Sequence, residues 1–229
     1  SRENYLFNAS LNGIEQSDFV LLIGTNPRYE ATILNARIRK SYLQNNFEVF
    51  SIGDIGDLTY PYTALSNETK VIKDIIEDNH EISELIKEAK KPIIIFGQSA
   101  MLSNSAKYIF ESVKSYLLKN NKISERWNSL NVLSENASTV GAFDLGIYKN
   151  EDAKNNILYD LKSNKFDVVY LLGQDNLNFK KQNEFIIYQG SHGDKGAEMA
   201  DIILPGAAYT EQNGYYTNLE GKLQKAFKA

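Results

Sequence analysis

Phe19-Val20-Leu21-Leu22-Ile23 is followed directly by Gly24, and this pattern of an apolar run closed by glycine decides the fold. It recurs at residues 49–52 before Gly53, 92–96 before Gly97, 168–172 before Gly173 and 185–189 before Gly190. Continuous apolar runs of this length are typical of strands that are buried on both faces, as in a parallel sheet. Ligand sites in such sheets lie just past the carboxyl ends of the strands. The residues that follow each glycine are therefore the first candidates for chemistry.

Helical patterns alternate with these runs. Ala31, Leu34, Ile38 and Tyr42 share one face of a helix predicted over residues 28–43. Further helices are predicted at residues 70–77, 81–90, 123–137 and 151–161, and from an Asn104 cap onward. The alternation predicts an α/β fold of mostly parallel sheets with flanking helices. The sequence has no obvious linker, and the most plausible domain boundary lies near Pro92. It divides the chain into a first α/β lobe over residues 1–90 and a second over 91–229.

Composition excludes several classes of site. The 229 residues carry 25 basic and 29 acidic side chains, a net charge of −4, so the chain has no basic footprint for nucleic acid. Cysteine is absent, which excludes disulfides, thiolate zinc sites and cysteine-held iron–sulfur clusters within this sequence. With His80 and His192 as the two histidines, a multi-histidine metal site is excluded as well. No apolar run approaches the ~20 residues that span a bilayer, so we expect membrane contact through partners only.

The loop Gly24-Thr25-Asn26-Pro27 allows two interpretations. Its backbone N–H groups and the following helix start could hold a phosphate. Alternatively, it is a simple turn in which Asn26 is extended before proline and Pro27 begins the helix. Spacing favours the turn, and we therefore expect Gly24, Thr25 and Asn26 to be at most a vestigial cofactor loop.

Other motifs are weaker. Gly53 and Gly56 match part of a dinucleotide fingerprint, but the third glycine is missing and Pro61 interrupts the helix that should follow. Ser191-His192-Gly193-Asp194 holds the residue types of a hydrolase triad, yet sequence neighbours do not face one another, and residues 97–100 lack the closing glycine of a nucleophile elbow. Asp201 and Glu220 could be paired carboxylates, but nothing in the sequence brings them together as an acid/base pair, and we expect them to cap loop amides and hold turns. We predict no catalytic residue and no metal ligand in this chain.

Three stretches carry a family resemblance. They are FVLLIGTNPRYEATILNARIRK (19–40), GDIGDLTYPY (53–62) and IIYQGSHGDKGAEMADIILPGAAYTEQNGYYTNLEGK (186–222). Together they resemble the large iron–sulfur subunit of respiratory complex I, the NADH:ubiquinone oxidoreductase, over nearly the whole chain in colinear order. The last stretch is shared broadly with molybdopterin oxidoreductases such as formate dehydrogenase, whereas the first is closer to complex I.

The resemblance implies a fold for this chain and places the redox cofactors elsewhere in the complex. The chain matches the interior of the molybdopterin-oxidoreductase-like, C-terminal part of that subunit, so both lobes would belong to one larger domain. Iron–sulfur clusters are expected upstream in the parent subunit, and FMN in a partner subunit. In molybdenum relatives, loops like the one at residues 24–26 hold the pyranopterin nucleotide, whereas in complex I that cofactor is absent. The start at Ser1 and the uncapped end at Ala229 lead us to expect a piece of a longer polypeptide.

We therefore expect a scaffold segment in the peripheral arm of complex I. It would brace the cluster-bearing part of its subunit and contact other peripheral-arm subunits, without binding a redox group itself. The expected location is the matrix side of the mitochondrial inner membrane, or the cytoplasmic side of a bacterial plasma membrane. Two rivals stay open: a fragment of a catalytic molybdopterin-dependent oxidoreductase, and a module that binds a nucleotide at residues 24–26.

Overall fold

The computed structural model describes residues 1–45, 47–147, 157–177 and 179–229, and it contains two compact units. Unit 1 comprises residues 1–146 and 217–223, and unit 2 comprises residues 147–216 and 224–229. The division expected between residues 90 and 91 falls inside unit 1. The strand that begins at Pro92 is hydrogen-bonded to the strand that begins at Phe19, so the chain on both sides of this seam belongs to one sheet.

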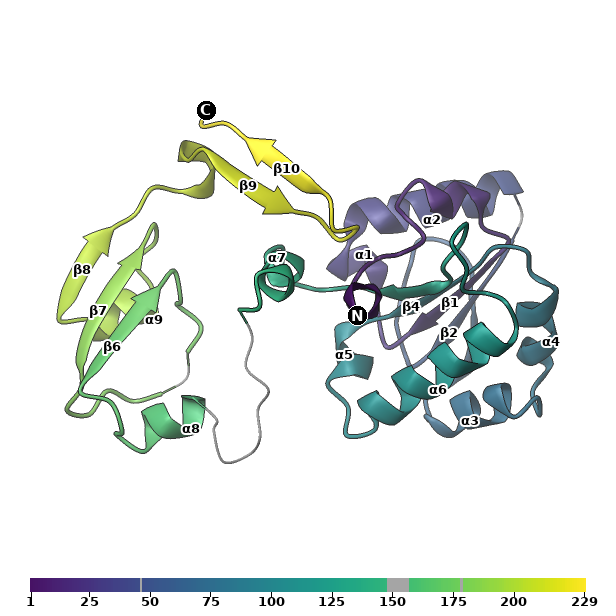
Figure 1. Ribbon diagram of the computed structural model, residues 1–229, viewed down its shortest axis with the longest axis horizontal. Helices are drawn as coiled ribbons and strands as arrows, with labels where there is room; N and C mark the ends of the chain where they lie inside the picture. The colour runs from purple at the N-terminus through teal and green to yellow at the C-terminus, as the bar shows by residue number, and fades with distance from the viewer. Residues whose placement is uncertain (46, 148–156, 178) are drawn as a thin grey trace. The chain divides into compact units, whose positions relative to one another are not determined.

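Unit 1 is built on a five-stranded parallel sheet (Figure 1). Its order is β3-β2-β1-β4-β5, and the strands are β1 (Phe19–Ile23), β2 (Glu48–Ile52), β3 (Thr63–Ser66), β4 (Pro92–Phe96) and β5 (Leu130–Val132). The chain builds the sheet outward from β1 in one direction and then from β4 in the other. The order therefore reverses between β1 and β4, and this switch point is where doubly wound sheets place their ligands.

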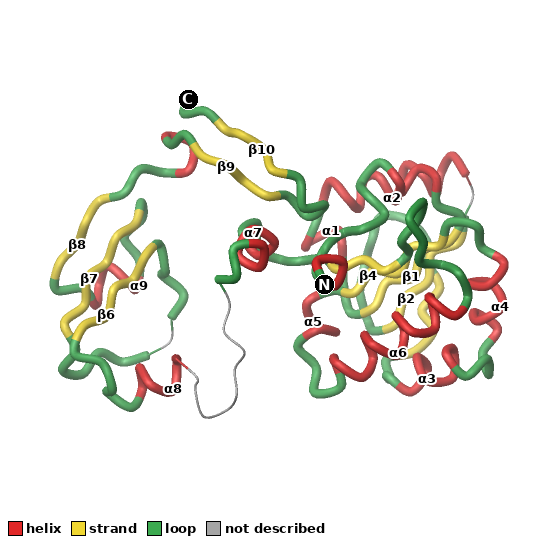
Figure 2. Tube along the Cα trace, viewed as in Figure 1, coloured by secondary structure: helices red, strands yellow, loops and turns green. Residues whose placement is uncertain are grey.

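Helices cover both faces of this sheet (Figure 2). On one face, Leu21, Ile23 and Ile94 pack against α3 (Lys70–Ile76), α4 (Glu81–Glu88) and α6 (Ala106–Lys119). On the other face, Val20, Leu22 and Ile95 pack against α2 (Thr32–Asn45) and the loops around it. Shorter elements complete the unit: α1 (Pro27–Glu30), α5 (Gln98–Met101), α7 (Thr139–Asp144) and the 3-10 helices η1 (Arg2–Asn4) and η2 (Gly13–Gln16).

The N-terminal residues meet a segment close to the other end of the chain within unit 1. The Phe7 amide donates to the Leu219 carbonyl at 2.9 Å, and the Leu11 amide donates to the Glu220 carboxylate at 2.6 Å. Arg2 forms a two-pronged ion pair with Asp144, at 2.8 and 2.7 Å, and also donates to the Gly221 carbonyl at 2.8 Å. Residues 217–223 are therefore an integral part of unit 1.

Unit 2 holds a three-stranded parallel sheet, in the order β6 (Val168–Leu172), β7 (Phe185–Gly190) and β8 (Ile202–Pro205). Its covered face contains Val169, Leu171, Ile186 and Tyr188, which share a buried cluster with Leu161 of α8 (Ile157–Lys162). The helix α9 (Lys195–Met199) packs on the same cluster through Ala197. The opposite face is exposed. A short 3-10 helix, η3 (Tyr209–Glu211), precedes a two-stranded sheet of β9 (Gly214–Thr217) and β10 (Leu223–Ala226).

The predicted α/β fold with parallel strands is confirmed, and all five apolar runs that end in glycine form strands. The helix predicted over residues 123–137 is wrong, because Leu130–Val132 is β5 and pairs with β4. The helix predicted over residues 28–43 is two helices, which are separated at Ala31. Residues 151–156 of the helix predicted at 151–161 lie outside the described residues, and the rest of it corresponds to α8.

Candidate functional site at the strand ends

The switch point of the unit 1 sheet is tightly packed by the chain itself. Gly24 follows β1 with a φ of +59°, a conformation that suits glycine. Gly97 follows β4, and a Cβ at that position would overlap the Thr25 side chain and the Gly24 carbonyl oxygen. The Ser99 hydroxyl donates to the Gly24 carbonyl. Thr25 therefore packs closely against Gly97 between the ends of β1 and β4, and the exposed Ser99 binds the Gly24 carbonyl beside them.

A carboxylate of the chain accepts the hydrogen bonds that this loop offers. Thr25 is 2% exposed, and its hydroxyl donates to one Glu30 oxygen at 2.8 Å. The Asn26 amide donates to the other Glu30 oxygen at 2.7 Å. Asn26 is the N-cap of α1, and its side-chain oxygen accepts from the Arg28 amide at 2.9 Å. Donors that would face an anionic ligand in a phosphate loop are therefore directed at Glu30.

The loop after β2 packs over the same residues. The Asn26 side-chain amide donates to the Ile55 carbonyl, and Arg28 pairs with Asp57. The Asp57 carboxylate also accepts from the Thr59 amide at 2.7 Å, which together with Arg28 lowers its pKa. The segment that resembles a dinucleotide fingerprint, with Gly53 and Gly56, therefore binds back onto residues 26–28 instead of opening a helix.

Buried polar contacts hold this second loop to α2. The Tyr60 hydroxyl donates to the Asn35 side-chain oxygen at 2.8 Å, and the Asn35 amide donates to the Leu58 carbonyl at 3.0 Å. Burial raises the pKa of Tyr60, so its hydroxyl stays protonated and acts as a donor. Such fully paired buried groups make the loop rigid.

Electrostatics at this edge disfavour a bound anion. A phosphate that took the donors of Thr25 and Asn26 would meet the Glu30 carboxylate at hydrogen-bond distance, and like charges in a partly buried site repel strongly. The described residues at the loop of Gly24, Thr25 and Asn26 do not fit a pyranopterin nucleotide without moving Glu30.

The other sequence candidates lie in structural contacts. His192 contributes its carbonyl as an acceptor for Tyr188 at 2.6 Å. Its ring Nδ1 lies 3.0 Å from the Ser191 hydroxyl, so the expectation that these two neighbours do not face one another is wrong. Asp201 accepts from the Ile186 amide at 2.8 Å and from Lys181 at 2.6 Å, and both contacts lower its pKa. Glu220 accepts from the Leu11 amide and pairs with Lys222 at 2.7 Å. The Glu220 contact agrees with the predicted capping of a loop amide, whereas Asp201 accepts from an amide of strand β7.

The strand ends of unit 2 are more open than those of unit 1. A hollow of about 710 Å³ lies beside them, lined by Asp175, Asn176, Asp194, Lys195 and Glu198, among others. Tyr188 donates to one Asp175 oxygen at 2.8 Å, while the other Asp175 oxygen is buried and has no hydrogen-bond partner. The other charged side chains at the rim are Asp194, Glu198 and Lys195, and they do not form a nucleophile–base pair.

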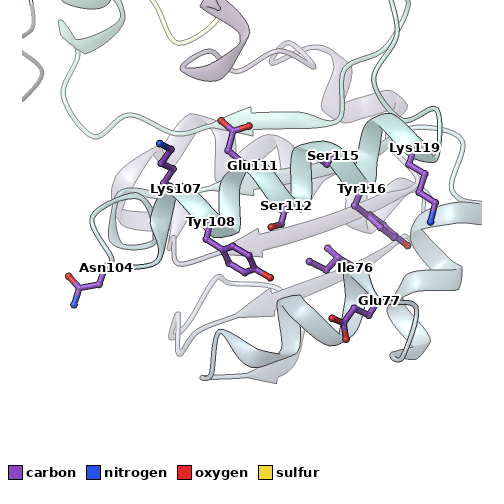
Figure 3. Close-up of a pocket in the computed structure, with 10 residues that line it drawn as sticks. All are labelled: Ile76, Glu77, Asn104, Lys107, Tyr108, Glu111, Ser112, Ser115, Tyr116 and Lys119. Atoms are coloured by element: carbon purple, nitrogen blue, oxygen red, sulfur yellow. The ribbon is translucent and has the colours of Figure 1, made fainter.

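A groove on the helical side of unit 1 lies between α3 and α6 and has a volume of about 780 Å³ (Figure 3). Ile76 of α3 and Tyr108 of α6 face one another across it, and Tyr116 lies at the far end. Burial raises the pKa of Tyr116 to about 12, so this phenol is not a base at neutral pH. The charged groups at the rim have mixed sign, which gives the groove no preference for a charged ligand.

Residues 1–45, 47–147, 157–177 and 179–229 contain neither a candidate metal site nor a candidate membrane-spanning helix. Among these residues, no three His, Asp or Glu side chains converge in a way that would hold a metal ion. No helix in this described part is long and apolar enough to span a bilayer.

The sequence predicted the position of the loop at residues 24–26, but not the contacts that Glu30, Ser99 and Ile55 make with it. Glu30 lies four residues after the N-cap Asn26, one position beyond that of a capping box, and in the first turn of α1, where the helix dipole favours a carboxylate. That spacing was a usable signal. Ser99 and the Ile55 contact come from segments far along the chain, and no local pattern predicts them.

Comparison with known proteins identifies the family. A family model described as molybdopterin oxidoreductase matches residues 1–229. The chain belongs to the molybdopterin oxidoreductase family. The formyltransferase/hydrolase complex from Methylorubrum extorquens, solved with methylofuran, aligns with 98% of this chain and 73% of its own at a TM-score of 0.66. At 12% identity that likeness shows the fold alone.

Curated relatives of this family member are subunits of complex I. The NADH-ubiquinone oxidoreductase 75 kDa subunit of Reclinomonas americana is 42% identical over the whole chain, which spans 33% of that relative. The 78 kDa mitochondrial subunit of Candida albicans is 41% identical over 97% of the chain and 30% of its own length. The corresponding NADH-quinone oxidoreductase subunit of the bacterium Rickettsia bellii is 42% identical over the whole chain and 32% of its own length.

These relatives confirm the predicted resemblance to the large subunit of complex I. They are mitochondrial and bacterial, and their subunit family contains iron–sulfur clusters. The chain spans about a third of the length of the curated relatives it matches.

Proposed function

We propose that this chain is a scaffold segment of the large iron–sulfur subunit in the peripheral arm of complex I. In this proposal it has the architecture of a molybdopterin oxidoreductase, carries no redox cofactor, and braces the cluster-bearing part of its subunit. Electrons would pass from NADH through FMN in a partner subunit and then through clusters to quinone. The segment would lie on the matrix side of the mitochondrial inner membrane, or on the cytoplasmic side in a bacterium.

The contact of Glu30 with the loop of Gly24, Thr25 and Asn26 carries this proposal. Both oxygens of the carboxylate accept from the loop, at 2.8 Å from Thr25 and 2.7 Å from Asn26. A loop that held an anionic cofactor at this strand end would direct such donors at it. Because Thr25 and Asn26 already donate to Glu30, this end of the sheet is more rigid and has less affinity for phosphate groups.

The five-stranded sheet supports a bracing role. Its central strands β1 and β4 are buried at every position, and close-packed interiors of this kind deform little. Redox centres that exchange electrons must be held at fixed spacing, and a rigid neighbour provides this without carrying a centre of its own.

The test is the cofactor content of the purified complex that contains this chain. We expect molybdenum and extractable pterin to be far below one per complex, with normal NADH:quinone activity. Iron measured in the same sample is the control, since the clusters of the parent subunit supply it. One molybdenum or pterin per complex, bound by this chain, would overturn the scaffold role in favour of a catalytic molybdopterin-dependent oxidoreductase.

A further inference from the structure

One face of the unit 2 sheet is apolar and uncovered. It comprises Val168, Tyr170, Leu172, Phe185, Ile187, Ile202 and Leu204, which we call the apolar face. The register places them together, since Val168 lies opposite Phe185, Tyr170 opposite Ile187, and Ile187 opposite Ile202. Six of the seven are more than 40% exposed. Gln189 is the one polar member of this side, and its side-chain oxygen accepts from the Tyr170 hydroxyl.

An apolar surface of this kind is expected to be buried by another segment of polypeptide. Soluble proteins rarely leave contiguous apolar patches of more than a few hundred Å² in water. All-parallel sheets occur almost only with both faces covered, because the crossover helices lie on the faces. The unit 1 sheet obeys that rule, with α2 on one side and α3, α4 and α6 on the other. In the described part of unit 2, α8 and α9 pack on the opposite side from the apolar face.

We propose that the apolar face binds an amphipathic helical layer from the part of the complex I large subunit that this chain does not span. This rests on the proposed function. The curated relatives are about three times as long as the matched segment, so their subunit contains the polypeptide needed for such a layer. A helical layer is the cover that parallel strands take elsewhere in this chain.

The composition of the apolar face restricts which side chains the bound helical layer can present to it. None of its positions is charged, although 24% of all residues are charged. The facing side chains must therefore be aliphatic or aromatic, because a charge buried there would find no partner. Tyr170 on β6 is the expected anchor, since tyrosine is among the side chains that contribute most to such contacts. A second copy of the chain would instead stack two sheets, which parallel sheets do not favour.

Site-specific photo-crosslinking in the assembled complex tests the identity of the occupant. A photoreactive amino acid replaces Leu172, which is 72% exposed, or Leu102 in unit 1 as the matched control at 75% exposed. We expect residue 172 to crosslink to a helical segment of the large subunit outside the stretch matched by residues 1–229. A crosslink to another copy of this chain, to residues 1–146 or to a different subunit would overturn the proposal, and so would a yield no higher than that at residue 102.

A charge on the face provides a second measurement. Leu172→Asp should reduce the fraction of chain that copurifies with the complex about tenfold or more, equivalent to ~1.4 kcal/mol, while Leu102→Asp leaves it unchanged. Equal copurification of both variants would contradict the docking. If the unaltered chain itself fails to copurify with complex I, the proposed function fails, and that outcome is separate from a failure at the apolar face.

Discussion

β1 and β6 have the same sequence pattern and different surroundings. Each is a run of five apolar residues closed by a glycine, yet every residue of β1 is buried, whereas residues of β6 alternate between exposed and buried. An apolar run therefore predicts a strand well and predicts the number of covered faces poorly. The cover depends on which helices the rest of the polypeptide supplies.

The connections explain the difference between the two sheets. The chain from β1 to β2 passes through α1 and α2, and the chain from β4 to β5 passes through α5 and α6, so helices reach both faces. In the described residues between β6 and β7 there is no helix, and α9 between β7 and β8 serves the face that is already covered. One face of β6 is left bare as a result.

The largest expected effect comes from truncating matched leucines in these two strands. Leu22→Ala in β1, at 0% exposure, should lower the free energy of unfolding by about 2–5 kcal/mol, because it leaves a cavity in a packed core. Leu172→Ala in β6 should change it by less than about 0.5 kcal/mol. Urea unfolding measures both, with Trp127 fluorescence reporting on unit 1 and far-ultraviolet circular dichroism on the whole chain. Equal losses would mean that this chain covers the apolar face by itself.

A smaller effect is expected at the strand ends, where unit 1 is closed and unit 2 is open. Glu30→Gln keeps the shape of the side chain and removes its charge, so the bonds from Thr25 and Asn26 weaken and unfolding free energy falls by about 1–2 kcal/mol. Glu198→Gln, at the rim of the unit 2 hollow, is the control and should stay within about 0.5 kcal/mol. An unchanged stability for Glu30→Gln would contradict the closed edge.

The smallest effect is a pH dependence in unit 1. Hydrogen bonds from Arg2 and Tyr5 lower the pKa of Asp144 to about 2. Its usual pKa is about 3.9 in an unfolded chain, so the ionised form stabilises the fold above about pH 4, and this contribution is lost as pH falls toward 2. Asp144→Asn should therefore be less stable than the unaltered chain at about pH 7, and most of this difference should be gone near pH 2.

Trp127 fluorescence follows that difference, because the tryptophan lies in unit 1. Asp201→Asn provides the comparison in unit 2, where the Ile186 amide and Lys181 lower the carboxyl pKa. It should leave the Trp127 transition unmoved at every pH. A gap between Asp144→Asn and the unaltered chain that is as large at about pH 2 as at about pH 7 would contradict the role of the Arg2 contact.

Patterns of local origin were predictable from the sequence. The strands that end in glycine, the helix start at Pro27 and the helix stripe of α4 follow from residues within a few positions of one another. β5 was not predictable in this way. Its central Asn131 is fully buried and accepts from the Ala9 amide at 2.8 Å, so its stability depends on a segment 122 residues away.

The candidate site shows the same limit. The loop of Gly24, Thr25 and Asn26 was located from its place after β1, and the favoured interpretation as a turn agrees with Asn26 as the N-cap of α1. Its closure by Ser99 and by the Ile55 carbonyl comes from strand ends that only the folded sheet brings together. β9 and β10 have no apolar run to mark them, and they were not predicted.

The contribution of residues 217–223 to unit 1 has a consequence for synthesis. A ribosome releases residues 1–146 well before it makes the Leu219 carbonyl and the Glu220 carboxylate that accept from Phe7 and Leu11. At roughly 5–20 residues per second, the interval is about 4–15 s. During that time the nascent N-terminal amides lack their final acceptors, and all of residues 147–216 emerge in between. Unit 1 is thus the first to be started and stays incomplete until nearly the whole of unit 2 has been made.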